Sequence, residues 1–464
     1  MTRLFFCLLV FSLCPVMTRA QSFSMDEAVA YALANAIEVQ DKNLQIARAD
    51  KDIKEFLSTG LPQVNGSANY QYFIDIPVQL VPIFPEQRTT LVQDIDGEVV
   101  PLTYTVTDDM GNPVFGPPQE FRFGLRNNLT AQLSVEALLF DGTFFTGLQA
   151  SKLYKELVQR EMAQTRSALA LNVRKAYLAV LAAEKNKEIL SKNISNLEKS
   201  LLETQAIYNE GFAEQLDVDR LALSLRNLKT EAQTIDRAIT TLRNMLKYRM
   251  GYPLEELITL TDNLDLLATK TVKEDIIPDA PFDITRRPEY RVLEQAEKLN
   301  DINIRRYQVG YLPALNAFGS YSRVLQADEL SDARWFPTTV VGLSLKVPVF
   351  DGFGKEARIQ KARIDLERTR LQRANFARTT RMEVINARIA YLNALETIRN
   401  REETVELAQR IYQTTQTKYR EGVGSSLEVN QAETDLFQSQ ANYIQALYEL
   451  LTAQVDLEKA LGTF

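Results

Sequence analysis

Carboxylates are plentiful in this chain of 464 residues, and they could carry out acid–base chemistry. The chain has 60 aspartates and glutamates but no histidine, so it lacks the commonest general base and the commonest metal ligand. Pairs of carboxylates can hydrolyse glycosidic bonds, which makes a glycosidase one function to consider. Most of these acids, however, flank the apolar positions of helical repeats, where a solvated helix face explains them better. We therefore expect no catalysis, no metal and no cofactor.

The first twenty residues predict a secretory signal peptide. Arg3 gives a positive start, residues 4–16 are nearly all apolar, and residues 18–20 form a small-x-small cleavage site. The apolar run is too short to span a bilayer as a helix. Both cysteines, Cys7 and Cys14, lie in this segment, and no small residue precedes Cys14 as lipid attachment would require. The exported chain is thus expected to have neither a lipid anchor nor a disulfide.

The charge balance limits the partners of the exported chain. The whole sequence has a formal net charge of −7, with both signs mixed along its length. This argues against nucleic acid as a partner. Beyond the signal, no apolar stretch is long enough for a transmembrane helix. If the protein spans a membrane, it must therefore do so with β-strands.

Glycine and proline divide most of the chain into two helical hairpins, at 143–250 and 353–461. Neither segment contains proline. Apart from Gly147 and Gly354 near their starts, their glycines are Gly211 in the first and Gly422 with Gly424 in the second. Apolar residues in the arms recur at alternating spacings of three and four, which is the repeat of a coiled coil. One such run is Leu221, Leu225, Leu228, Ala232, Ile235, Ile239, Leu242 and Leu246. The hairpins are expected to be long rods.

The two hairpins belong to two copies of one unit. The shared landmarks are Phe140–Gly142 and Phe350–Gly352 before the hairpins, Tyr208–Gly211 and Tyr419–Gly422 at their turns, and Gly251 and Gly462 at their ends. They keep the same order and an offset of 210 or 211 residues, so we infer a tandem duplication. The expected organisation is repeat 1 over 21–250, a linker over 251–283 and repeat 2 over 284–464, each repeat starting with a helix.

One pair of strands is predicted in each repeat, at 63–73 with 126–140 and at 312–326 with 336–350. Their side chains alternate between apolar and polar, as suits a strand between lipid and a wet lumen. The half-buried strands of a soluble sandwich alternate in the same way, but neither repeat offers strands for a second sheet. The connection at 74–125 is long and rich in proline and acids, and we expect an outer loop there.

Four strands cannot close a membrane barrel, because the smallest single-chain barrels use about eight. An open sheet edge is not tolerated in lipid, so several chains must join, although the strand count does not give their number. Tyr70, Tyr72, Tyr321 and Trp335 lie near predicted strand ends. They could form an interfacial aromatic girdle or belong to ordinary surface packing.

The order and spacing of these motifs resemble those of the TolC-type outer-membrane factors, the exit ducts of tripartite efflux pumps and type I secretion systems. The resemblance rests on Phe-Asp-Gly at each junction and on Tyr-x-x-Gly followed by Leu-acid-Val at each turn. It implies a mainly α fold with β-strands, in which a homotrimer forms a twelve-stranded transmembrane β-barrel with four strands per chain. A periplasmic α-helical coiled-coil barrel continues it. It also implies a location in the Gram-negative outer membrane.

The same resemblance implies a gate and a docking site at the hairpin turns. Asp217, Tyr419 and Glu428 fall on lock positions of the gate, with Gln431 at a position where the family has a second acid. Gly424 stands where the family has an arginine, although Arg220 and Arg420 lie nearby. The expected docking residues for a periplasmic adaptor, and through it an inner-membrane transporter, are Gly211, Leu216, Gly422, Gly424 and Leu427.

The carboxylates at the turns also allow a simpler interpretation. Copies of Glu428 around an axis would form an acidic ring that repels itself or binds cations. Asp217 and Glu428 could equally do no more than favour their helix N-termini electrostatically.

Two functions from different classes fit the sequence. One is a passive duct, and the other is a secreted or periplasmic coiled-coil scaffold without channel activity. The heptads fit both, while the signal and the duplicated amphipathic strands favour the duct. A detergent requirement and a heat-modifiable oligomer would distinguish the duct from a freely soluble rod.

Overall fold

The computed structural model describes residues 21–81, 85–94, 96–115, 119–122, 124–273 and 282–463. The predicted signal peptide, with Cys7 and Cys14, lies outside these residues. The chain divides into two compact units. The helical unit comprises Met1–Lys54, Thr146–Tyr307 and Gly354–Phe464, and the sheet unit comprises Glu55–Phe145 and Gln308–Phe353.

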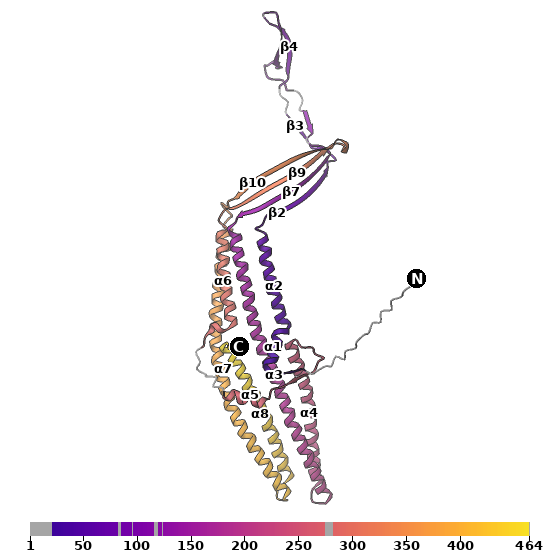
Figure 1. Cartoon of the computed structure of the whole chain (residues 1–464), viewed down its shortest axis with the longest axis vertical. Helices are drawn as coiled ribbons and strands as arrows, with labels where there is room; N and C mark the ends of the chain where they lie inside the picture. The colour runs from indigo at the N-terminus through magenta and orange to yellow at the C-terminus, as the bar shows by residue number, and fades with distance from the viewer. Residues whose placement is uncertain are drawn as a thin grey trace, which may run out of the picture. The chain divides into compact units, whose positions relative to one another are not determined.

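Two long hairpins, drawn side by side in Figure 1, form most of the helical unit. The first consists of α3 (Gly142–Asn209) and α4 (Gln215–Met250), and the second of α7 (Gly354–Arg420) and α8 (Ser426–Leu461). Shorter helices precede each hairpin, namely α1 (Met25–Asn35), α2 (Ile37–Ser58), α5 (Leu264–Lys273) and α6 (Pro288–Val309). Within the described residues, no helix has the length and hydropathy that crossing a bilayer requires.

Polar contacts between the long helices establish their order in the helical unit. Arg243 of α4 donates to Glu184 of α3 at 2.7 Å, and Asn193 of α3 donates to Gln440 of α8 at 2.9 Å. On the other side of α8, the Lys459 Nζ lies 3.3 Å from a carboxylate oxygen of Glu383 in α7. The order is therefore α4, α3, α8, α7, and α4 and α7 are the outer members.

Two equivalent tyrosines mark the core of the helical unit. Tyr177 of α3 and Tyr391 of α7 are both buried, and each hydroxyl donates to a backbone carbonyl. Tyr177 donates to Phe23 at 2.9 Å, and Tyr391 donates to Thr271 in α5 at 3.2 Å. Phe23 belongs to β1 (Gln21–Phe23), which pairs in parallel with β8 (Ile258–Leu260). Both β8 and α5 lie in residues 251–283, the segment expected to be a linker. Where it is described, this segment therefore forms secondary structure that packs into the core of the helical unit.

The sheet unit is built on four antiparallel strands in the order β10–β9–β7–β2, two from each repeat. Their bounds are Arg334–Lys346, Ala314–Ala327, Asn127–Phe140 and Gln63–Tyr72. Residues paired directly across antiparallel strands lie on the same face. The row Gly66, Leu133 and Tyr321, and the row Tyr70, Leu129, Leu325 and Trp335, therefore lie on one face, together with Val341, Leu343 and Leu345 of β10.

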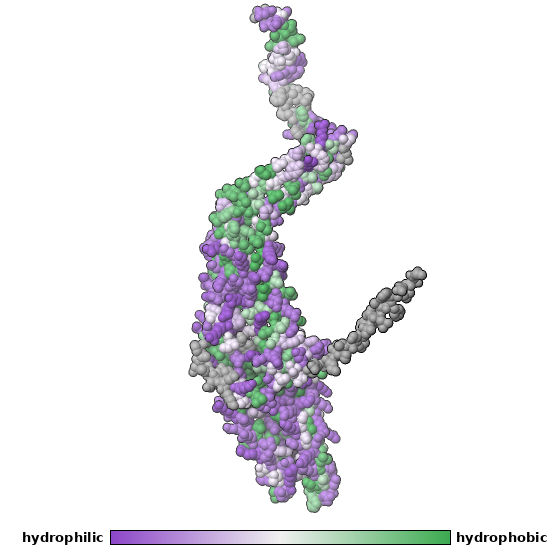
Figure 2. Space-filling view, in the orientation of Figure 1, coloured by the Kyte–Doolittle hydropathy of each residue, from purple (hydrophilic) through white to green (hydrophobic). Residues whose placement is uncertain are grey.

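The opposite face of this sheet carries mostly polar side chains. Asn65, Ser67, Asn69 and Gln71 of β2 pair with Ser134, Gln132, Thr130 and Asn128 of β7. Most of the large apolar residues of the first face are exposed in the single chain, and Figure 2 shows hydrophobic surface on the sheet near the start of β9. The prediction of one apolar and one polar face is thus confirmed by the register.

Ten strands, rather than the four expected, lie in the described residues. The segment predicted as an outer loop contains two short ribbons, β3 (Val78–Val81) with β6 (Gln119–Arg122) and β4 (Gln87–Gln93) with β5 (Val99–Thr105). The threonine- and valine-rich runs of β4 and β5 favour strands, and they outweigh the nearby prolines. A second difference is that β10 ends at Lys346 instead of 350, because Pro348 cannot donate a hydrogen bond to a neighbouring strand.

The two Phe-Asp-Gly junctions differ in conformation despite their shared sequence. In the first, the Asp141 carboxylate accepts from the Thr143 backbone N–H at 2.7 Å and caps the start of α3. In the second, both Gly352 and Phe353 have a φ of 65°, and α7 starts two residues later than its counterpart. A positive φ at phenylalanine is an energetic cost that glycine does not incur.

Each second arm ends at a left-handed glycine that packs against the beginning of its own repeat. Gly251 follows α4 with a φ of 69°, and a Cβ added to it would lie 2.8 Å from the Asn35 carbonyl oxygen, at the break between α1 and α2. Gly462 follows α8 with a φ of 72°, and its Cβ would lie 3.0 Å from the Arg286 Cβ, just before α6. Only glycine fits such a turn and such a contact.

We predict that Gly251→Ala destabilises the helical unit. A left-handed backbone costs a residue with a Cβ about 1–2 kcal/mol, and the contact with Asn35 adds to this. The measurement is the loss of helical circular dichroism on heating. Gly66→Ala is the matched control, because no atom lies within 4 Å of its added Cβ and its φ is not in the left-handed region. Equal melting temperatures for both variants would contradict the prediction.

Candidate functional site at the hairpin tips

The hairpin tips, residues 208–217 and 419–428, reverse the chain with the same hydrogen-bond pattern. The Gly211 N–H donates to the Tyr208 carbonyl and the Phe212 N–H donates to the Ile207 carbonyl, at 2.8 and 3.0 Å. Gly422 and Val423 make the equivalent bonds, both at 3.0 Å. Two such bonds, with the glycine left-handed, make a Schellman motif. The duplicated Tyr-x-x-Gly sequence therefore gives two equivalent turns.

Gly424 differs in conformation from the other two glycines of the tips. Its φ is outside the left-handed region, unlike those of Gly211 and Gly422. A Cβ at this position would lie 3.1 Å from the Tyr419 backbone nitrogen and 3.2 Å from the Lys418 Cβ. Glycine is therefore favoured there by the close approach of the end of α7 and not by its conformational freedom.

The two tips cap their second helices differently. The backbone N–H of Glu214 donates to the Asp217 carboxylate at 3.3 Å, as part of a capping box at the start of α4. In the second tip, the Glu428 backbone N–H donates to the hydroxyl of the N-cap residue Ser425 at 3.3 Å. Glu428 therefore lies in the first turn of α8, but its own side chain is not used in the cap.

Three polar contacts join the first tip to the second. The Ser426 hydroxyl donates to the Asp217 carboxylate, and Arg220 Nη1 donates to the same hydroxyl at 3.5 Å. Farther from the turn, Arg420 Nη2 donates to Glu203 of α3 at 3.0 Å. Sequence reasoning did not name Ser426 or Glu203, and it named Arg420 without a direction. No repeat landmark marks these residues, because each is specific to one copy.

Tyr419 is half-buried beside these contacts. Burial raises the pKa of its hydroxyl, and the charge of Asp217 raises it further. Tyr419, Ser426, Arg420 and Glu203 line a small cavity of about 40 Å³ between the helix ends. The structure thus brings together two of the residues expected in the gate, Asp217 and Tyr419.

The other two expected gate residues do not join this contact. Glu428 is exposed, and within the described residues its side chain has no hydrogen-bond or ion-pair partner. Gln431 is also exposed and donates to Asp435 on its own helix at 3.0 Å. In a single chain, Glu428 therefore presents a free carboxylate to its surroundings.

Apolar side chains project from both tips. Phe212 is 85% exposed and Val423 is 77% exposed, and each directly follows its turn glycine. Leu216 and Leu427, which we expected at a docking site, are about half exposed. Phe212 and Val423 were not named from the sequence, although their equivalent positions after Gly211 and Gly422 could have identified them. Four exposed apolar residues around two rigid turns form a surface suited to a protein partner.

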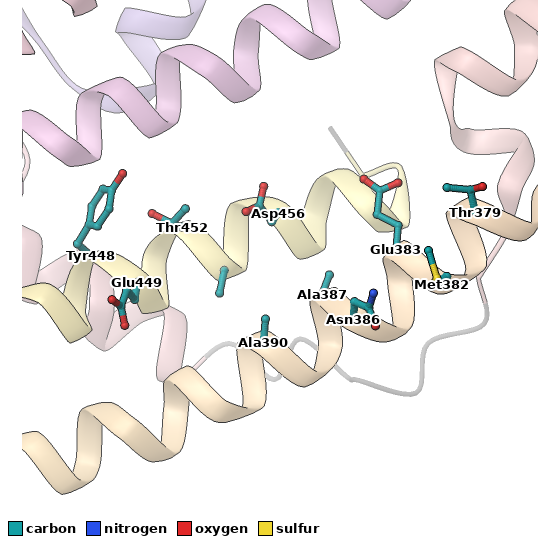
Figure 3. Close-up of a pocket in the computed structure, with 11 residues that line it drawn as sticks. Thr379, Met382, Glu383, Asn386, Ala387, Ala390, Tyr448, Glu449, Thr452 and Asp456 are labelled. Carbon is teal, nitrogen blue, oxygen red and sulfur yellow. The ribbon is translucent and has the colours of Figure 1, made fainter. Parts of the chain in front are cut away.

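An open groove between α7 and α8, with a volume of about 750 Å³, is less suited to chemistry (Figure 3). Two of its carboxylates have cationic partners, since Glu383 pairs with Arg287 and Lys459, and Asp456 pairs with Lys175. In the described residues, no three histidine, cysteine, aspartate or glutamate side chains gather as a metal site would require. The tips remain the better candidate.

Comparison with known families gives one match, which covers the second repeat. Residues 284–463 match the family described as outer membrane efflux protein. The chain is 24% identical over 318 residues to the proteases secretion protein PrtF of Dickeya chrysanthemi, covering 67% of this chain and 63% of that relative. It is 24% identical over 366 residues to the outer membrane protein TolC of Salmonella enteritidis, covering 73% of this chain and 70% of the relative.

Solved structures share the fold over nearly the whole chain. The MtrE outer membrane channel of Neisseria gonorrhoeae, in its open state, gives a TM-score of 0.69 at 15% identity, covering 94% of this chain and 88% of that one. The CmeC outer membrane channel of Campylobacter jejuni gives 0.68 at 14% identity, covering 94% and 85%. The expected mainly α fold with β-strands is confirmed by these neighbours.

We predict that Asp217→Ala loosens both tips. The substitution removes the capping box of α4 and the acceptor of the Ser426 hydroxyl, and loss of a cap alone typically costs about 1 kcal/mol. The measurement is amide hydrogen exchange over residues 205–222 and 420–432. Asp219→Ala is the control, because Asp219 is exposed in the next turn and accepts only from Gln215 of its own helix. Faster exchange in the first tip alone would show that the contact with Ser426 does not couple them.

Proposed function

We propose that the chain is a member of the outer membrane efflux protein family, whose model matches its second repeat, and that it is the outer-membrane exit duct of a tripartite efflux pump or type I secretion system. Relatives of this chain include a toluene efflux pump outer membrane protein of Pseudomonas putida and a proteases secretion protein, which correspond to these two systems. The duct is a passive conduit that extends from the outer membrane into the periplasm. An inner-membrane transporter, reached through a periplasmic adaptor, supplies the energy.

The observation that carries this proposal is the register of the four-stranded sheet. Leu129, Leu133 and Val135 of β7 and most of the large apolar side chains of β10 lie on one face, which suits contact with lipid. Within the described residues, neither β2 nor β10 has a strand on its outer side. Unpaired backbone groups are very costly in lipid, so these edges must meet the edges of other copies. Three copies, with twelve strands, are the number that the family resemblance implies.

The outer helices support the same assembly. Met382, Ile385, Ile389 and Leu392 of α7 are about half exposed and follow one another at spacings of three and four. This is a coiled-coil stripe that has no partner in the described part of the single chain. On the opposite outer helix, α4, Leu223, Met245 and Tyr248 are exposed. We propose that α7 of one copy packs against the α4 side of the next.

The tips are proposed to perform two tasks in the assembled duct. Asp217, Tyr419, Glu428 and Gln431 form the periplasmic gate, in which the free carboxylates of Glu428 from several copies repel one another or bind cations. The turns around Gly211, Gly422 and Gly424 dock the adaptor. The apolar contacts with the adaptor come from Leu216 and Leu427, together with Phe212 and Val423. Exposure of these four side chains supports the docking role.

We predict that Ile385→Asp with Ile389→Asp reduces the oligomer in detergent. Each aspartate would place a charge in the proposed helix contact, where burying an unpaired charge costs several kcal/mol. The mass of the detergent-solubilised protein, measured by light scattering, checks this. Val99→Asp is the control, since Val99 is equally exposed but lies in β5, outside the stripe. A full-sized oligomer in the double variant would rule out this packing.

We predict that Glu428→Ala with Asp217→Ala raises the conductance of the purified protein in planar lipid bilayers. The double variant removes the acids of the gate and the contact that joins the tips. Glu403→Ala with Glu406→Ala removes the same charge from exposed sites on α7 and should leave the conductance unchanged. Unchanged conductance and ion selectivity in the tip variant would exclude Glu428 from the gate. A wild-type protein that never conducts would overturn the duct itself.

A further inference from the structure

Glu433 of α8 is a buried acid that neither the gate nor the docking surface uses. It is 2% exposed, and both oxygens of its carboxyl group lack a hydrogen-bond partner in the described part of the chain. On its own helix, the buried Val429, Ala432 and Leu436 surround it. The equivalent position in the first repeat is Ala222. An unpaired carboxylate at such a site costs far more than an alanine, so it calls for a physical explanation.

The position of Glu433 is defined by its neighbours along α8. Ser426 lies seven residues before it and contacts Asp217 at the first tip. Gln440 lies seven residues after it and accepts from Asn193 of α3 at 2.9 Å. Residues one heptad apart share a face of a helix. Glu433 therefore lies between two contacts that join the second hairpin to the first, and we call this line of contacts the hairpin seam.

Among the residues that the structure describes, the groups around Glu433 offer it no compensating charge. From α7, Tyr412 is the neighbour whose hydroxyl its charge affects, and that hydroxyl lies beside Ser200 of α3. Glu203 of α3 and Arg420 of α7, the next charges toward the tip, pair with each other. At the tip end of the seam, Arg220 and Asp217 of α4 both contact Ser426. The acids of α8 itself, Glu428 and Asp435, are exposed.

Burial without a partner favours the neutral form of an acid. It raises the pKa of Glu433 from its ordinary value near 4.5 to about 7. At pH values between about 4.5 and 7, Glu433 keeps its proton while the hairpins are packed, but it would lose that proton if the hairpins separated and water reached it. The packed state is therefore fully stabilised below about pH 4.5, and its stability falls as the pH rises toward 7.

We propose that Glu433 is a proton-dependent latch of the hairpin seam, distinct from the acids of the gate. While Glu433 is neutral, α8 stays packed against α3 near the tips. When it loses its proton, the carboxylate needs water, which separation of the two hairpins would admit. The inference rests on the proposed function, because separation of hairpins within each copy would widen the periplasmic end of the duct.

The test is the conductance of the purified protein in planar bilayers at about pH 5.5 and about pH 8, where a group with a pKa near 7 changes from mostly neutral to mostly ionised. We expect the wild-type conductance to be about twofold or more higher at the higher pH. Glu433→Gln keeps the shape and cannot ionise, so its conductance should stay at the low value. Glu449→Gln is the control, because Glu449 is an exposed acid on the same helix outside both the gate and the hairpin seam, and this variant should keep the pH response.

A second measurement does not depend on channel activity. Amide exchange over residues 426–440, corrected for the intrinsic effect of pH, should increase several-fold from the lower to the higher pH in the wild type but not in Glu433→Gln or Glu433→Met. An identical pH response in the wild type and both Glu433 variants would overturn the latch. If the wild-type exchange responds as expected but no variant conducts at any pH, the latch stands and the proposed duct fails.

Discussion

The unsatisfied backbone hydrogen bonds along β2 and β10 are the constraint on which the rest of the structure depends. Four strands form a complete ladder only among themselves, and each outer strand keeps a row of donors and acceptors without a partner in the described chain. One face of this sheet is apolar, so water cannot satisfy those groups if that face lies in lipid. In the proposed duct the chain is therefore incomplete as a monomer, and the exposed stripe on α7 agrees with this in the helical unit.

Much of the fold was predictable because its signals are local and repeated. Long heptads, isolated glycines at the turns and strict alternation in the four strands each depend on neighbouring residues, and the duplication provided a second copy of every signal. The outer ribbons were not predicted. Their strands are short and pair only with each other, so no wider pattern distinguished them from a proline-rich loop.

The site was less predictable than the fold, because contacts between the hairpins produce no periodic pattern in the sequence. The family resemblance pointed to Asp217 and Tyr419, and the structure brings them together. It could not indicate that Ser426 links the tips, since hydroxyls are common near helix starts. Glu433 did leave a signal, because the heptad of α8 extended backwards from Leu436 reaches it in three residues. An acid at that position interrupts the apolar pattern, so a search for apolar heptad positions alone does not find it.

The helices of each repeat also differ in continuity, which has a mechanical consequence. α3 and α7 are continuous for 68 and 67 residues. In contrast, the end of α4 meets the start of α2 near Gly251, and the end of α8 meets the start of α6 near Gly462. A continuous helix curves gently along its length, whereas two helices that meet end to end can change direction where they meet. A change in the direction of α4 or α8 should thus occur mainly near Gly251 and Gly462, while the continuous α3 and α7 bend elastically and favour a return to the original conformation.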